Sequence, residues 1–205
     1  MVTTTQKSKK YIYVLLSKTY TMPARIIRLV TKEPYSHTSI ALDKQLVELY
    51  SFARKGIYNP LNSGFVVEDL ERGVFGMDQN ITCSVYQVPV TEEQYQILKD
   101  EIDCFVNNAD EYGYNYFGLF TIMLGMNIYD GKHFFCSQFV SYLFSKCGMP
   151  LFTREHGLVR PYDFHKKLKE YRIYKGKLSE YRESLNQLSY EDEDEEYFYE
   201  DYAIG

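Results

Sequence analysis

A cysteine stands at the expected start of a helix in the stretch KHFFCSQFVSYLFSKCGMP, residues 132–150. The apolar positions of this stretch recur at the spacing of one helical face, which predicts a helix from 136 to 147 lined by Cys136, Phe139, Val140, Leu143, Phe144 and Cys147. Gly148 and Pro150 supply a stop signal. Because backbone N–H groups and the helix dipole favour an anion at a helix N-terminus, Cys136 lies where a thiolate is stabilised. The sequence therefore marks Cys136 as a candidate nucleophile.

A nucleophilic cysteine needs a base, and the sequence holds four histidines, at 37, 133, 156 and 165. In SHTSIAL, residues 36–42, a strand would place His37 on one face with Ser39 and Ala41. These small neighbours leave room for a helix tip to pack over the imidazole, so we expect His37 to be the base. His133 is the rival candidate, although it would have to fold back over the start of the helix.

The next expected strand, residues 45–53, carries Glu48 on the same face as Leu46, Tyr50 and Phe52. A buried carboxylate without a partner is costly, so Glu48 should find one. If the turn before it has two residues, Glu48 lies opposite or diagonal to His37 on one sheet face. Glu48 would then orient one ring nitrogen while the other accepts the thiol proton. Glu48 at a water-facing edge is the ordinary alternative.

Structural roles and metal binding are the alternatives for the cysteines. A free cysteine often packs as a small hydrophobe. A zinc site from His133, Cys136 and Cys147 is not expected, because the two cysteines lie at opposite ends of one helix and no second ligand pair is spaced for metal. Cys104 points away from the apolar stripe of its own helix, and we assign it no role. We expect no cofactor and no metal.

The surrounding elements predict an α+β fold with a mostly antiparallel sheet. Strands are expected at residues 11–17, 36–42, 45–53, 64–70 and 80–90, with a tight turn at 43–44. Helices are expected at 24–30, from a Thr91–Gln94 capping box to 109, at 116–126, at 136–147 and from Pro161 onward. The 116–126 segment is apolar all round, which favours a buried helix, with lipid or acyl-chain contact as the alternative.

Composition favours one domain over residues 1–188. A chain of 205 residues with 45% hydrophobic content can bury a sizeable core. The four cysteines form no CxxC pair, and the first residues lack the pattern of an export leader, so we expect a reduced, cytoplasmic setting. No apolar stretch approaches the length that spans a bilayer, so we expect no transmembrane segment.

Charge is distributed unevenly along the chain. The net charge is −5, yet eight acidic residues lie in 189–202, which leaves +3 for the rest. We expect 189–205 to be a flexible acidic tail, and residues 166–182 to form a basic patch that the tail could screen. No nucleic-acid-binding signature accompanies the patch, so no nucleic acid is expected as a partner.

Five short motifs resemble one known family. These are SHTSI at 36–40, the strand with Glu48, YNYFGL at 114–119, FCSQFV at 135–140 and RPYDF at 160–164. Together they resemble the circularly permuted papain-like hydrolases, relatives of the NlpC-type cell-wall amidases and of the lecithin retinol acyltransferase group. The resemblance covers roughly residues 11–170, and its order of histidine, acid, then cysteine is the permuted one.

The resemblance implies an α+β fold in which the cysteine helix packs its N-terminus against an antiparallel sheet. It implies Cys136 as nucleophile, His37 as base, Glu48 as orienting acid and the Cys136 backbone N–H as part of an oxyanion hole. We take Tyr114, Tyr116, Phe117 and Gln138 as candidate substrate-binding residues.

These observations predict a thiol hydrolase or acyl transferase. It would cleave an amide, ester or thioester of a peptide, acyl or lipid-like small substrate through an acyl-cysteine. The alternative is a catalytically silent papain-like module that binds a partner through its acidic tail.

Overall fold

The computed structural model describes residues 9–19, 33–56, 59, 62–78, 80–185 and 187. The expected helix at 24–30 and the acidic segment 189–205 lie outside the described residues. Within them, no helix is long and apolar enough to cross a membrane.

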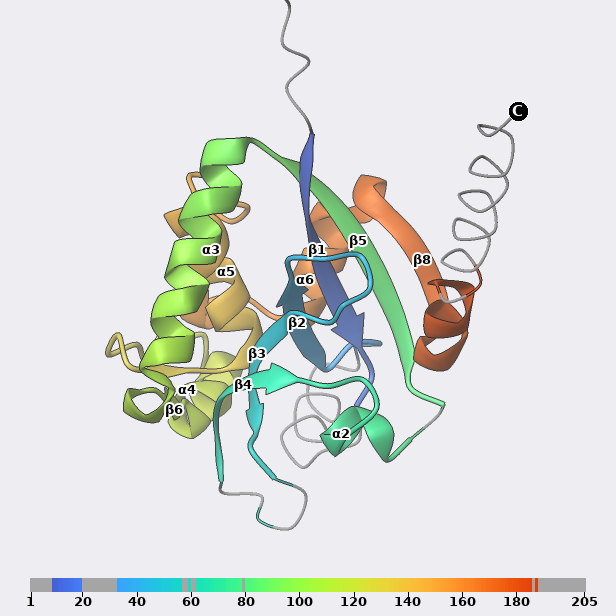
Figure 1. Cartoon of the computed structure of the whole chain (residues 1–205). Helices are drawn as coiled ribbons and strands as arrows, with labels where there is room; N and C mark the ends of the chain where they lie inside the picture. Colours follow the sequence, from blue (N-terminus) through green and yellow to red (C-terminus); the bar gives the residue numbers. More distant parts are fainter. Residues whose placement is uncertain are drawn as a thin grey trace, which may run out of the picture.

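One mixed sheet of eight strands organises the described chain (Figure 1). Its order is β7-β6-β4-β3-β2-β1-β5-β8, and its pairs are antiparallel except for the parallel pair β6–β7. The strands are β1 Lys10–Ser17, β2 His37–Ala41, β3 Leu49–Arg54, β4 Ser63–Glu68, β5 Thr82–Val90, β6 Gly113–Tyr114, β7 His133–Phe134 and β8 Arg172–Lys177.

Helices accompany this sheet, which confirms the α+β prediction. They are α2 Gly73–Gly76, α3 Glu92–Asn107, α4 Tyr116–Thr121, α5 Cys136–Lys146 and α6 Pro161–Lys167, with 3-10 turns η1 Ala109–Glu111, η2 Ile122–Leu124, η3 His156–Leu158 and η4 Lys169–Tyr171. The Thr91–Gln94 capping box opens α3 as predicted. Gly148, at φ 77°, follows the end of α5, where the sequence predicted a stop.

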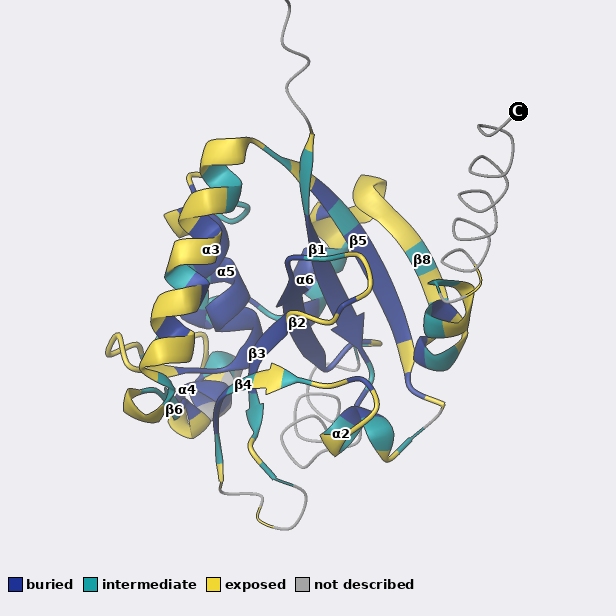
Figure 2. Cartoon of the chain, in the orientation of Figure 1, coloured by how far each residue is buried: buried dark blue, intermediate teal, exposed yellow. Residues whose placement is uncertain are grey.

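Helix α5 packs against β2 and β3, and α3 packs on α5. Figure 2 shows the result: the sheet centre and α5 are buried, while the outer side of α3 is exposed. At the centre of this layer, five phenylalanine rings form one connected cluster: Phe52, Phe65, Phe105, Phe134 and Phe139. The ring centroids of its contacting pairs are 5.0–6.3 Å apart. Burying such rings is worth roughly 1.5–3 kcal/mol each, so this cluster holds the N-terminal half of α5 in place.

The expected strand at 45–53 begins later than predicted, because the turn before it is longer. Both Asp43 carboxylate oxygens accept backbone N–H groups, from Val47 at 3.0 Å and Glu48 at 2.7 Å. An aspartate that caps its own loop in this way stabilises a wide connection rather than a two-residue turn. Strand β3 therefore starts at Leu49, and Glu48 belongs to the loop.

The 116–126 segment is not the buried helix that its composition predicts. Helix α4 ends at Thr121, a 3-10 turn follows, and Gly125 at φ 69° closes it. Exposed apolar side chains result, with Phe117 and Leu124 each 66% exposed and Met126 49%. The buried-helix prediction is wrong because uniform apolar character does not reveal which side chains the sheet leaves uncovered.

Candidate active site

Cys136 is the first residue of α5, as the sequence predicted. Phe135 before it is extended, and its carbonyl accepts the first helical hydrogen bond from Phe139. The Gln138 side-chain oxygen accepts from the Phe135 N–H at 3.4 Å and from Asn115 Nδ2 at 3.3 Å. These contacts fix the helix start, and Cys136 lies buried there with 2% of its surface exposed.

His37 is the first residue of β2 and is also buried. The charge of Cys136 and a side-chain interaction with it are among the causes that raise the pKa of His37, so the two side chains lie close together. His37 Nε2 lies 2.7 Å from Glu68 Oε1, so Nδ1 is the ring nitrogen that remains for the sulfur. The structure therefore brings together the cysteine and histidine that lie 99 positions apart in the sequence.

Glu68, the last residue of β4, takes the place that the sequence gave to Glu48. Leu49 pairs with Glu68 on one side and with Ala41 on the other. Paired residues share a sheet face, so Glu68 lies on the face of Ala41, Ser39 and His37. The Ser39 hydroxyl donates to the second oxygen of Glu68. Each carboxylate oxygen of Glu68 therefore interacts with a side chain of β2.

The expectation for Glu48 is wrong in its geometry. Glu48 is exposed in the loop before β3, where its carbonyl accepts from the Leu42 N–H at 3.4 Å. The loop shift moves Glu48 off the face that His37 occupies, because a one-residue change along a strand turns a side chain to the other face.

The ion pair between His37 and Glu68 favours the charged form of His37. Burial by itself lowers the pKa of His37, but the charges of Glu68 and Cys136, with hydrogen bonds to both, raise this pKa from 6.5 to about 10. His37 is therefore an imidazolium at neutral pH. A cation next to a cysteine sulfur favours the thiolate.

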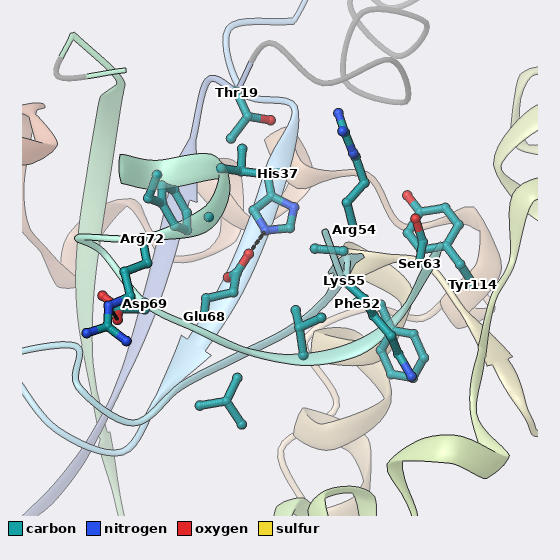
Figure 3. A pocket seen from close by; sticks show the side chains of 16 residues that line it. Thr19, His37, Phe52, Arg54, Lys55, Ser63, Glu68, Asp69, Arg72 and Tyr114 are labelled. Carbon is teal, nitrogen blue, oxygen red and sulfur yellow. Dashed lines mark hydrogen bonds and ion pairs between the residues drawn. The ribbon is translucent and has the colours of Figure 1, made fainter. Parts of the chain in front are cut away.

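A cavity of about 220 Å³ opens beside this pair (Figure 3). His37 and Glu68 form one part of its wall and Tyr114 another. Burial, and after it the negative charge of Cys136, raise the pKa of the Tyr114 hydroxyl well above its usual range. Tyr114 therefore keeps its proton and remains a hydrogen-bond donor near the sulfur. The cavity is thus lined by the two side chains, His37 and Tyr114, whose pKa values Cys136 helps to raise.

Tyr114 also lines a second cavity, of about 250 Å³, on the side of α4. Tyr116 and Phe117 line this cavity, and the ring centroids of Tyr114 and Tyr116 are 4.7 Å apart. The fourth candidate substrate-binding residue, Gln138, is fully buried and, among the described residues, is absent from the walls of both cavities. Its contacts position the start of α5.

The rival base His133 lies in β7, away from the pairing described above. Its Nδ1 is 2.6 Å from Asp130 Oδ2, and its side chain is half exposed. Among the described residues, no group of three or more His, Cys, Asp or Glu side chains could hold a metal ion.

Comparison with protein-family models, with curated proteins and with solved structures gave no match.

Sequence reasoning missed Glu68 and Ser39. The signal was present, because Glu68 ends a strand and Ser39 shares a face with His37. Choosing Glu68 over Glu48 required the β3–β4 register, which depends on the loop that Asp43 organises.

Proposed function

We propose that this protein is a thiol hydrolase or acyl transferase with Cys136 as nucleophile, His37 as base and acid, and Glu68 as the orienting carboxylate. The observation that carries the proposal is the continuous chain of contacts from the Cys136 side chain through His37 to Glu68. This order of nucleophile, base and orienting group is what covalent acyl-transfer catalysis requires.

The first half of the reaction forms an acyl-cysteine. The Cys136 thiolate attacks the carbonyl carbon of an amide, ester or thioester, and the carbonyl electron pair moves to oxygen. When the tetrahedral intermediate collapses, the bond to the leaving group breaks and the His37 imidazolium gives its proton to that group.

The second half regenerates the enzyme. Neutral His37 accepts a proton from water, or from a second nucleophile, as its oxygen, nitrogen or sulfur attacks the acyl-cysteine. The Cys136 sulfur leaves as thiolate and His37 is again an imidazolium. Water gives hydrolysis, and another acceptor gives acyl transfer.

Two donors are suited to stabilise the oxyanion. The backbone N–H of Cys136 is in the first turn of α5, where N–H groups lack intrahelical acceptors. The Tyr114 hydroxyl keeps its proton close to the sulfur. Glu68, fixed by Ser39, holds the imidazole with Nδ1 toward Cys136.

The family proposed for this chain is the circularly permuted papain-like hydrolases. The order of His37, Glu68 and Cys136 in the chain, and the cysteine helix lying against a largely antiparallel sheet, support this assignment.

The acyl-cysteine is testable with p-nitrophenyl acetate, a general acyl donor. We expect a burst of p-nitrophenol and, by peptide mass spectrometry, one acetyl group on Cys136. The Cys136→Ser and His37→Ala variants should lose the burst, whereas Glu48→Gln should keep it. A silent binding module would give slow acetylation of exposed thiols and no burst from Cys136.

A further inference from the structure

Asn115, the residue after Tyr114, is buried and uses both ends of its carboxamide for hydrogen bonds. Its Nδ2 donates to the Ile128 carbonyl at 2.8 Å and to Gln138 Oε1 at 3.3 Å. Its Oδ1 accepts from the Gly118 N–H at 2.7 Å. An amide that is paired at both its oxygen and its nitrogen is held in one orientation.

The backbone places Asn115 beside the strand that leads to the cysteine. Tyr114 of β6 pairs in parallel with Phe134 of β7, and the Asn115 N–H donates to the Phe134 carbonyl at 2.9 Å. Cys136 follows two residues after Phe134. Strands as short as β6 and β7 contribute few ladder hydrogen bonds, so side chains must fix the rest of this junction.

Gln138 completes the connection between the two strands and α5. Its Oε1 accepts from Asn115 Nδ2 at 3.3 Å and from the Phe135 N–H at 3.4 Å. This bridge joins the residue after Tyr114 to the residue before Cys136. Asn115 is 6% exposed and Gln138 is 0% exposed, so water does not compete for these hydrogen bonds.

Gly118 leaves the space that the Asn115 carboxamide occupies. A Cβ built at position 118 would overlap the amide nitrogen, carbon and oxygen of Asn115. The asparagine and the glycine of the motif YNYFGL, residues 114–119, therefore serve the same contact.

We propose that Asn115 is a positioning residue for acyl transfer, which holds the Tyr114 hydroxyl where the oxyanion forms beside Cys136. It acts through its bridge to Gln138. The inference rests on the proposed function, in which Tyr114 is an oxyanion donor and lines the same cavity as His37 (Figure 3). Misplacing such a group by about 1 Å costs on the order of 100-fold in rate.

Two reactions of the same sulfur test this role. Acylation of Cys136 by p-nitrophenyl acetate passes through a tetrahedral oxyanion. Alkylation by iodoacetamide forms a sulfur–carbon bond as iodide leaves, and no oxyanion arises. Asn115→Ala should therefore slow acylation about ten- to 100-fold and change the alkylation rate by less than about twofold. Equal changes in both rates would show a structural role only and would overturn the inference.

Tyr114→Phe removes the donor itself and should give the same selective loss, on the order of 100-fold. In the double variant with Asn115→Ala, acylation should fall by no more than about threefold beyond Tyr114→Phe alone, because Asn115 acts through Tyr114. Losses that multiply would overturn the inference.

Gln138→Met breaks the bridge from its other end and keeps the length of the side chain. It should also slow acylation more than alkylation, and it decides the matter if Asn115→Ala does not fold. The matched control is Asn108→Ala, in which an exposed asparagine at the end of α3 loses its bond to the Cys104 carbonyl. This control should leave both rates at Cys136 unchanged.

The wild type separates the two proposals. If it gives no burst from Cys136, the proposed function fails and this inference fails with it. If it gives a burst that Asn115→Ala and Gln138→Met leave unchanged, this inference alone is overturned.

Discussion

Glu68 Oε1 lies 2.7 Å from His37 Nε2, although 31 residues separate the two in the chain and β3 lies between their strands. This contact leaves His37 Nδ1 for Cys136 and keeps the imidazole charged. Through the contact between His37 and Glu68, the register of the sheet affects the reactivity of the Cys136 sulfur at the start of α5.

Glu68→Gln removes the negative charge that raises the pKa of His37. We expect this pKa to fall well below about 10, and the burst with p-nitrophenyl acetate to weaken by at least about 100-fold. NMR titration of the imidazoles measures the shift. His156 and His165, whose pKa values burial lowers, serve as internal references. The control Glu48→Gln should leave His37 unchanged, and an equal effect of both variants would contradict the assignment of Glu68.

Ser39→Ala removes the hydroxyl that holds the second oxygen of Glu68. Ser39 is a positioning residue, so we expect a smaller loss of about three- to tenfold in acylation rate, matching about 1 kcal/mol for one hydrogen bond. The pH at which His37 titrates should also move, and Ser39→Thr should restore both properties. A loss of stability with the His37 titration unmoved would show a structural role only.

The raised pKa of His37 predicts how stability varies with pH. Above pH 6.5 the unfolded chain releases the proton of His37 and the folded protein retains it up to about pH 10. Stabilisation from the protonated pair is therefore complete below pH 6.5 and is lost as pH rises toward 10. The free energy of unfolding, from urea titrations across this interval, should fall more steeply in wild type than in His37→Gln. Parallel curves would argue against a charged His37.

Phe139→Ala tests whether the aromatic cluster fixes the cysteine helix. Phe139 is fully buried and contacts the rings of Phe52, Phe65 and Phe105, so its truncation should cost about 3–5 kcal/mol of unfolding free energy. Exposed Phe117, truncated in the same way, should cost less than about 0.5 kcal/mol. Urea unfolding monitored by circular dichroism compares the two, and equal costs would contradict the packing described.

The local sequence predicted α3, α5 and the strand of His37 well, because capping residues and apolar spacing act over a few positions. The predicted start of β3 was wrong because Asp43 organises a wider loop. The length of this loop depends on side-chain hydrogen bonds of Asp43. Glu68 could not be chosen over Glu48 without that register. The exposure of Phe117 and Leu124 likewise depends on where the sheet ends, which no local pattern encodes.

The rate of alkylation of Cys136 by iodoacetamide near pH 6, compared with that of Cys104 in the same molecule, tests the central claim most directly. Cys136 is 2% exposed and Cys104 is exposed, so accessibility alone favours Cys104. A thiolate paired with His37 predicts that Cys136 reacts first, and that His37→Ala slows it on the order of 100-fold while Cys104 is unchanged. Faster labelling of Cys104, with a Cys136 rate that His37→Ala does not alter, would contradict the account.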